Sequence, residues 1–297
     1  MRQVRVTART TEAEDVVSFT LSGDALPAWT PGAHIDVEVR PGVLRQYSLC
    51  GDPASPEWRI AVLREDPGRG CSRHLHESLS VGDEVRVSDP RNNFSLVPAA
   101  GYSFVAGGIG ITPLLPMLRA AGTDWTLYYG GRRRSRMAFL AELAGYGDRV
   151  RVLPEDTHGL LPLADIVAEG RLVYCCGPEP LLAAVESVCP PDRLRVERFH
   201  PRVVSAAASG SFEVLASLSG QTVEVSATES ILDALDLAGV GVPSSCREGT
   251  CGTCETPVLD GEVDHRDSVL TAEERAAGKS MMICVSRARS ARLVLDV

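Results

Sequence analysis

The chain has 297 residues, of which 44% are hydrophobic and 23% are charged, and its formal net charge is -9. A chain of this size can build two or three globular domains, and its negative charge argues against nucleic-acid binding. Because the N-terminal segment lacks an apolar signal core and no run of about 18 uncharged apolar residues occurs, we expect a cytoplasmic protein without a membrane partner.

Residues 1–98 consist of short alternating runs separated by turns rich in Pro, Gly and Asp. HIDVEVR, LRQYSLC and DEVRVSD are examples of these runs. Alternation with this spacing predicts a small antiparallel β-barrel. One short helix is predicted over residues 72–79.

Residues 99–200 change to a strand-then-helix rhythm. YSFVAGG is followed by PLLPMLRAAG, WTLYYGG by MAFLAELAG, and RLVYCCG by PLLAAVESV. This alternation predicts an α/β domain with a doubly wound parallel sheet. The small residues at 201–210 then predict a linker.

Residues 211–297 begin with a predicted hairpin that turns at Ser219-Gly220. A helix opened by Ser230, with Asp233 three residues on, is predicted next. This part of the chain has 14 Asp plus Glu against 7 Lys plus Arg, so it carries -7 of the total charge. The C-terminal third is therefore the acidic part.

The chain has nine cysteines, and a reducing compartment favours metal ligands, buried thiols or reactive thiols over disulfides. The spacing C-x4-C-x2-C with a distant fourth cysteine is that of a plant-type 2Fe-2S cluster, and Gly249 and Gly252 let the loop wrap closely. A structural zinc site is the alternative, although it usually consists of two C-x2-C knuckles. The candidate ligands are Cys246, Cys251, Cys254 and Cys284.

Two motifs in residues 99–200 indicate nucleotide binding. GGIGITP, from residue 107, follows a strand and opens a helix, so its N-H groups could approach a pyrophosphate. YCCGP, from residue 174, stands at the carboxyl end of a later strand, where open sheets bind ligands. Glycines at such turns can also be purely structural. The candidate residues are Gly108, Gly110, Thr112, Pro113, Gly177 and Pro178.

The run CREGTCGTCETPVLDGEVDHRDSVLT and the ending MMICVSRARSARLVLDV resemble the C-terminal ferredoxin domain of the phthalate dioxygenase reductase family, which includes vanillate O-demethylase reductases. The resemblance covers essentially the whole chain. It implies a multidomain protein with an antiparallel flavin-binding β-barrel (1–98) and a nicotinamide-binding α/β domain (99–200). A β-grasp (α+β) plant-type ferredoxin domain (211–297) follows the linker.

The run RQYSL, from residue 45, resembles the family's R-x-Y-S flavin motif. Its Arg could hold a phosphate and its Tyr could pack against the ring, although an arginine on a strand is common. GRGCS, from residue 68, precedes a helix whose N-terminus suits a phosphate, and related members often carry Gly in place of Cys71. FMN is expected, because no separate adenine-binding segment indicates FAD. The candidates are Arg45, Tyr47, Ser48, Leu49, Gly70, Cys71 and Ser72.

The family's C-G-P segment makes Cys176 the residue near the nicotinamide. Its E-x-F ending makes Phe199 a shield for the flavin, with a simple core phenylalanine as the alternative. The arginines at 132–134 could clasp a 2'-phosphate or form a solvated loop. The family favours NADH, with NADPH as the alternative.

The resemblance implies the reductase component of a Rieske-type aromatic oxygenase or O-demethylase system. Electrons would pass from NADH to FMN, then to the 2Fe-2S cluster and to the oxygenase. The six histidines show no Cys-x-His spacing, so the sequence predicts no Rieske cluster of its own. The alternatives are a haem-thiolate monooxygenase as acceptor and a redox sensor without turnover. A monomer is expected.

Overall fold

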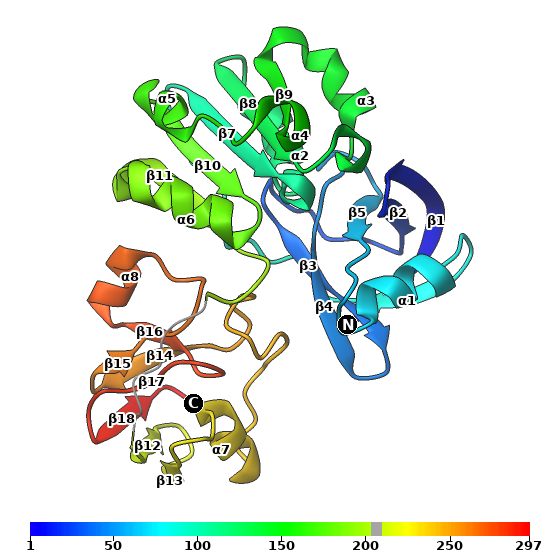
Figure 1. Cartoon of the computed structure of the whole chain (residues 1–297). Helices are drawn as coiled ribbons and strands as arrows, with labels where there is room; N and C mark the ends of the chain where they lie inside the picture. Colours follow the sequence, from blue (N-terminus) through cyan, green and yellow to red (C-terminus); the bar gives the residue numbers. More distant parts are fainter. Residues whose placement is uncertain (203–209) are drawn as a thin grey trace. The chain divides into compact units, whose positions relative to one another are not determined.

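The computed structural model describes residues 1–202 and 210–297. The chain divides into two compact units, Met1–Glu197 and Arg198–Val297 (Figure 1). The predicted barrel and residues 99–197 of the predicted nicotinamide domain fall in the first unit, whereas residues 198–200 fall in the second. The predicted domain boundaries at 98 and 200 stay predictions. Most of the predicted linker, residues 203–209, lies outside the described residues. In the described ranges, no helix has the length and apolar character needed to cross a membrane.

The first unit contains a six-stranded antiparallel sheet in the order β4-β3-β6-β1-β2-β5. An isolated bridge between Leu49 and Ile60 joins its two edges, so the sheet closes into the predicted barrel. The helix begins one residue earlier than predicted, because Gly70 takes a left-handed φ of 79° and turns the chain into it. The elements are β1 (Arg2–Ala13), β2 (Val16–Ser22), β3 (His34–Arg40), β4 (Val43–Ser48), β5 (Trp58–Leu63), α1 (Cys71–Ser78) and β6 (Glu84–Val87).

A five-stranded parallel sheet, in the order β11-β10-β7-β8-β9, forms the rest of the first unit. Every residue of β7 is buried, as expected for a parallel strand covered on both faces. The strands are β7 (Tyr102–Gly107), β8 (Trp125–Gly131), β9 (Val150–Pro154), β10 (Leu172–Cys176) and β11 (Leu194–Glu197). The helices are α2 (Leu114–Ala120), α3 (Leu140–Leu143), α4 (Glu155–His158), α5 (Leu163–Ala168) and α6 (Glu179–Val188), with 3₁₀ helices at Gly108–Ile111, Arg134–Arg136, Ala144–Arg149 and Pro191–Arg193.

The predicted helix over MAFLAELAG is shorter than expected. Phe139 takes a left-handed φ of 63°, so α-helical geometry starts only at Leu140. The Phe139 ring is buried, and the Arg59 guanidinium lies 5.1 Å from its centroid. This packing against the barrel explains why the helical pattern is interrupted.

The second unit is built on a five-stranded sheet in the order β13-β12-β18-β14-β16, with a separate β15-β17 pair. The predicted hairpin is the antiparallel β12-β13 pair. The predicted cap is also present, since Ser230 Oγ accepts from the Asp233 N-H at 3.0 Å. The elements are β12 (Phe212–Ala216), β13 (Gln221–Val225), α7 (Ile231–Leu237), β14 (Glu255–Asp260), β15 (Val263–Asp264), α8 (Ala272–Ala277), β16 (Ser280–Met282), β17 (Arg287–Ala288) and β18 (Arg292–Leu295).

Helix α7 completes the core of the second unit. It buries Ile231, Leu232 and Leu235 in one hydrophobic cluster with residues of the sheet. A mixed sheet with a helix packed on it is the expected β-grasp arrangement. This core holds both ends of the loop between α7 and β14, which carries three of the predicted cluster ligands.

Candidate functional site

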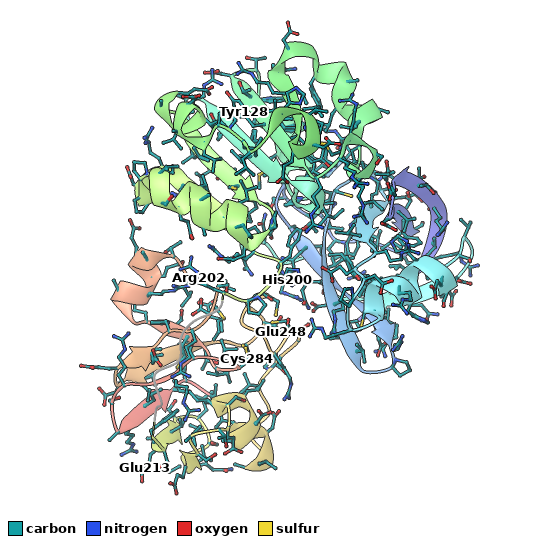
Figure 2. The ribbon with its side chains drawn as sticks, viewed as in Figure 1. Tyr128, His200, Arg202, Glu213, Glu248 and Cys284 are labelled. Atoms are coloured by element: carbon teal, nitrogen blue, oxygen red, sulfur yellow. The ribbon has the colours of Figure 1, made fainter. Side chains whose placement is uncertain are left out.

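Four cysteine side chains meet in the second unit, around the loop of residues 246–254, which we call the ligand loop. Cys251, Cys254 and Cys284 are buried, whereas Cys246 is partly exposed. Figure 2 labels Cys284, and Glu248 on the ligand loop. The Ile283 N-H donates to the Cys254 carbonyl at 3.4 Å, which holds the distant fourth cysteine beside the loop.

The four thiols interact in a chain, in the order Cys251, Cys246, Cys284 and Cys254. Hydrogen bonds with the Cys251 and Cys284 thiols lower the pKa of Cys246. A hydrogen bond with the Cys284 thiol lowers the pKa of Cys254. Across residues 1–202 and 210–297, no group of three or more His, Cys, Asp or Glu side chains is arranged to hold a single metal ion. Four thiols brought together in this way fit a two-iron unit, in which each iron takes two thiolates.

Backbone amides point at the sulfur of Cys246. The N-H groups of Glu248 and Thr250 donate to its Sγ at 3.3 and 3.5 Å. Gly249 stands between these donors with a φ of 71°, and a Cβ there would lie 2.6 Å from Val285 Cγ2. Glycine is therefore required at this turn. Amide donors of this kind stabilise negative charge on a metal-bound sulfur.

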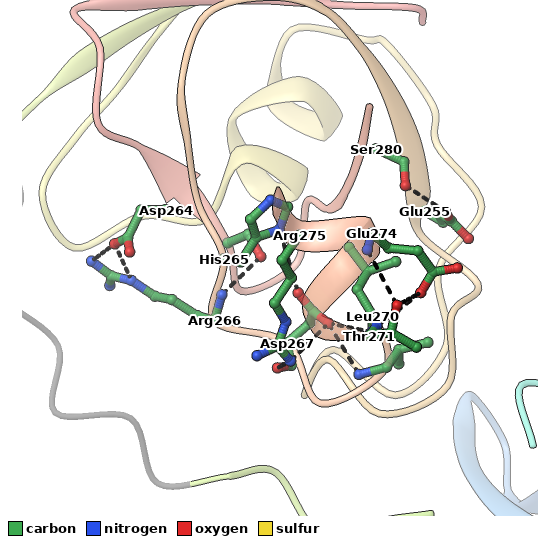
Figure 3. Close-up of polar contacts among 12 residues, drawn as sticks. Glu255, Asp264, His265, Arg266, Asp267, Leu270, Thr271, Glu274, Arg275 and Ser280 are labelled. Atoms are coloured by element: carbon green, nitrogen blue, oxygen red, sulfur yellow. Dashed lines mark hydrogen bonds and ion pairs between the residues drawn. The ribbon is translucent and has the colours of Figure 1, made fainter. Parts of the chain in front are cut away.

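Asp267 is a buried acid next to the ligand loop, since a Cβ at Gly249 would lie 3.2 Å from its Cα. Figure 3 shows its polar contacts. Its Oδ2 accepts from the N-H groups of Val269 and Leu270 at 3.0 and 2.8 Å, and Arg275 Nη2 lies 3.6 Å from that oxygen. His265 Nδ1 lies 3.7 Å from Oδ1. Burial lowers the pKa of His265, so its neutral form is favoured at neutral pH.

Ser268 connects two parts of the second unit that are distant in sequence. Its N-H donates to the Gly249 carbonyl at 2.8 Å, and its Oγ accepts from the Arg202 N-H at 2.9 Å. One residue therefore holds both the ligand loop and the segment with which the second unit begins.

The two predicted flavin segments lie together in the first unit. Burial raises the pKa of Tyr47, the Cys71 thiol adds to this effect, and Arg45 opposes it. These three side chains are thus close enough to interact. Arg45 Nη1 also donates to the Leu44 carbonyl at 2.7 Å, which fixes the guanidinium against β4.

The other predicted flavin residues are more constrained. The Ser72 hydroxyl accepts from the Glu65 N-H at 3.1 Å, so it holds the chain before α1. Ser48 is buried and Leu49 is completely so. Leu49 is closed to a ligand here, because the whole residue is buried and its N-H donates to the Ala33 carbonyl at 2.8 Å. Gly70, which directly precedes α1, has a left-handed backbone and carries no side chain.

The two predicted nucleotide motifs meet at the carboxyl ends of adjacent parallel strands. Ala106 of β7 is paired with Cys176 of β10. A Cβ at Gly110 would lie 2.2 Å from the Cys176 carbonyl oxygen, and one at Gly107 would lie 2.7 Å from Pro178 Cδ. The glycines are therefore required by the close approach of the two loops. This is the edge of an open sheet at which nucleotides bind.

The first of these loops is open at one point. Gly108 has a φ of 56°, and a Cβ there would meet no atom within 4 Å. Thr112 donates its hydroxyl to the Ile109 carbonyl at 3.0 Å, and Pro113 directly precedes α2. Gly177 packs against Gly107. The space beside Gly108 is thus open, while Thr112 and Gly177 are held by their neighbours.

Glu197 is a candidate that the predicted site residues did not include. The Cys176 Sγ lies 4.0 Å from its Oε2. Burial raises the pKa of Glu197 to about 8. Burial is also the largest cause of the raised pKa of Cys176. The sequence signal was an acid that ends a parallel strand. Phe199 follows two residues later, in the second unit, and is 36% exposed.

Residues 216–289 match the family described as 2Fe-2S iron-sulfur cluster binding domain. The phenoxybenzoate dioxygenase subunit beta of Ectopseudomonas oleovorans is 46% identical over 99% of this chain and 97% of its own length. The solved structure of phthalate dioxygenase reductase, titled a modular structure for electron transfer from pyridine nucleotides to [2Fe-2S], is 39% identical to this chain. It aligns with a TM-score of 0.69 over 100% of this chain and 98% of that one.

A third comparison concerns a longer protein. The structure of an intact type IV self-sufficient cytochrome P450 monooxygenase is 45% identical and aligns with a TM-score of 0.93 over all of this chain. The chain spans 41% of that protein. The fold of both units is therefore found as a complete protein and as part of a larger one.

Proposed function

This chain belongs to the phthalate dioxygenase reductase family, and from that membership we propose that it is the NAD(P)H-dependent reductase component of a Rieske-type aromatic oxygenase or O-demethylase system. When bound, a flavin accepts a hydride and a 2Fe-2S cluster carries single electrons onward. A reducing cytoplasm, which keeps the cluster thiolates available, suits this role.

One observation carries the proposal. A single chain combines four neighbouring cysteine thiols in one unit with two glycine loops that meet at a parallel sheet edge in the other. The first arrangement suits a one-electron centre and the second suits a nucleotide. Plant-type clusters have potentials of about -400 mV and Rieske centres roughly -150 to +300 mV, so transfer to such an acceptor is downhill.

Residues between Arg45 and Phe199 would bind and orient the nucleotide cofactors. Arg45 would hold a flavin phosphate, and Tyr47 would pack against the flavin ring. Backbone amides near Gly108 would hold the pyrophosphate of the nicotinamide nucleotide. Cys176, with Glu197 beside it, would line the nicotinamide position, and Phe199 would shield the flavin.

The identity of each cofactor is part of the proposal. The family resemblance favours FMN over FAD and NADH over NADPH. Arg132, Arg133 and Arg134 are exposed after β8, where they could meet a 2'-phosphate, so both nicotinamide nucleotides must be compared. We also propose that the protein acts as a monomer, which light scattering of the purified protein tests.

The central experiment is an anaerobic titration of the purified protein with NADH, followed by absorption spectroscopy. We expect flavin and cluster bands that both bleach, two irons per chain, and FMN on extraction. Zinc in place of iron, or a cluster that stays oxidised, would contradict the proposal. Rapid NADH-dependent reduction of cytochrome c would exclude a sensor without turnover.

A haem-thiolate acceptor is the less favoured alternative. The P450 protein is matched over part of its length, whereas the two oxygenase-related proteins are matched almost end to end. Parallel assays with a Rieske-type oxygenase and a haem-thiolate monooxygenase would distinguish the acceptors. Faster turnover with the haem-thiolate enzyme would reverse our preference.

A further inference from the structure

Arg247, the residue after Cys246, has an unusual backbone. Its φ is 55°, in the left-handed region that side chains other than glycine disfavour. Gly249 and Gly252, in the same loop, also have positive φ values, but they bear no Cβ. Some other interaction must therefore hold Arg247 in this conformation.

The side chain of Arg247 supplies that interaction. Its Nη1 donates to Asp233 Oδ1 at 2.6 Å and its Nη2 donates to Asp236 Oδ2 at 3.0 Å. The two acids stand three residues apart on α7, and Ser230 Oγ donates to the other oxygen of Asp233 at 2.6 Å. A single exposed ion pair would be weak. A guanidinium shared by two carboxylates on one helix has a defined geometry.

The left-handed turn has a direct consequence for the sulfur of Cys246. The Glu248 and Thr250 N-H groups that follow Arg247 are the ones that donate to this Sγ, at 3.3 and 3.5 Å. Hydrogen bonds to cluster sulfurs raise the reduction potential, because they stabilise the more negative reduced state. The conformation of Arg247 thus controls donors that tune the cluster.

We propose that Arg247 is a positioning residue that raises the reduction potential of the cluster by tying the ligand loop to α7 and aiming two amides at Cys246. This inference rests on the proposed function, since it takes the four thiolates as cluster ligands. The competing account is that Arg247 acts only through its positive charge.

The variant Asp236→Asn separates the two accounts. Its side chain contacts Arg247, whereas Asp233 also takes part in the cap of α7. Removing a negative charge should raise the potential if charge alone matters. If positioning matters, the variant should loosen the ligand loop and so lower the potential. Asp260→Asn, an exposed acid on β14, is the matched control for the loss of one negative charge.

The experiment is a redox titration of the holoprotein, with EPR of the reduced cluster and iron analysis, for wild type, Asp236→Asn, Asp260→Asn, Arg247→Lys and Arg247→Gly. We expect Asp236→Asn and both Arg247 variants to keep two irons, to broaden the EPR signal and to lower the potential. For Arg247→Gly the electron-sharing constant between flavin and cluster should fall about tenfold, equivalent to about 59 mV. Arg247→Lys should recover part of this loss.

Each contrary outcome has a distinct meaning. A raised potential with an unchanged EPR signal in Asp236→Asn would overturn positioning in favour of charge. Two irons with unchanged potentials in all three variants would overturn the inference alone. Absence of iron from the wild-type protein would overturn the proposed function and the inference with it.

Discussion

The Cys176 Sγ lies 4.0 Å from Glu197 Oε2 at the carboxyl edge of the parallel sheet, and burial raises the pKa of Glu197 to about 8. This carboxyl therefore keeps its proton at neutral pH. An uncharged acid next to the thiol avoids placing an anion in the pocket proposed for the nicotinamide.

The raised pKa predicts how stability depends on pH. A carboxyl that holds its proton in the folded state but ionises near 4.5 when unfolded destabilises the fold progressively as the pH rises from about 4.5 to 8. The Glu197→Gln variant has no such carboxyl, so its free energy of unfolding should fall less than that of wild type as the pH rises. The difference in stability between variant and wild type should therefore shift in favour of the variant between pH 5 and pH 8. Urea unfolding of the holoprotein at several pH values would measure it.

The control for that experiment is Glu155→Gln, which changes an exposed acid of the same unit. It should follow the wild-type pH profile. If Glu197→Gln followed the wild-type profile as well, the carboxyl would be ionised in the folded protein and its assignment would be wrong.

Serine at any of the four cluster positions should abolish electron delivery to a one-electron protein acceptor. Cys246→Ser, Cys251→Ser, Cys254→Ser and Cys284→Ser each remove a thiolate, whereas the proposed flavin and nicotinamide residues from Arg45 to Pro178 lie in the other unit. Flavin reduction by NADH should therefore persist. Stopped-flow absorbance and iron analysis would separate the two steps.

Cys189→Ser is the matched control, because Cys189 is a buried thiol of the first unit. It should keep both irons. A full cluster in Cys284→Ser would show that another residue is the fourth ligand.

Arg45→Ala should weaken flavin binding much more than NADH binding. Loss of a charge-assisted phosphate contact costs about 1.5–3 kcal/mol, or roughly ten- to a hundredfold in affinity. Fluorescence titration of the apoprotein with FMN would measure the loss. Arg86→Ala removes another barrel arginine, one paired with Glu38, and should leave the affinity unchanged. Equal affinities for both variants would refute the phosphate role of Arg45.

Gly110→Ala should disrupt the nucleotide site. Its Cβ would lie 2.2 Å from the Cys176 carbonyl oxygen, and overpacking of this kind costs about 1–3 kcal/mol. We expect a lower thermal midpoint and a raised KM for NADH. Gly145→Ala, where a Cβ meets no atom within 4 Å, is the control and should shift stability by less than about 0.5 kcal/mol. Similar behaviour of the two variants would contradict the close approach of the loops.

The acidic second unit predicts electrostatic steering of the acceptor. Residues 211–297 carry -7 of the net charge, so an oxygenase with a basic patch should associate faster at low salt. Screening limits such charges to about 8 Å at physiological ionic strength. The second-order rate should therefore fall with salt, while NADH reduction of the flavin changes much less. A flat rate would mean that the acidity serves solubility.

The features with strict periodicity or spacing were predictable from the sequence. The hairpin at Ser219-Gly220 and the cap at Ser230 follow from local rules, and both are present. The left-handed backbone of Phe139 was not predictable, because it depends on packing against Arg59 from the barrel. Contacts between residues that are distant in sequence are therefore the part of the fold that local sequence patterns do not predict.

The candidate site likewise has features that the sequence predicts and features that it does not. The cysteine spacing indicated all four candidate ligands, because a cluster imposes that spacing. The proximity of Glu197 to Cys176 arises from the register of two parallel strands, which the sequence does not reveal. The hold of Arg247 on α7 likewise depends on where the loop folds back.

The two hydrogen bonds of Ser268 determine where the chain is best divided into fragments. A fragment that begins at residue 211, where the ferredoxin-like sequence pattern starts, would lack Arg202 and its bond to Ser268. That serine also holds Gly249 in the ligand loop. A fragment or fusion meant to carry the cluster by itself is therefore better started at Arg198, the first residue of the second unit.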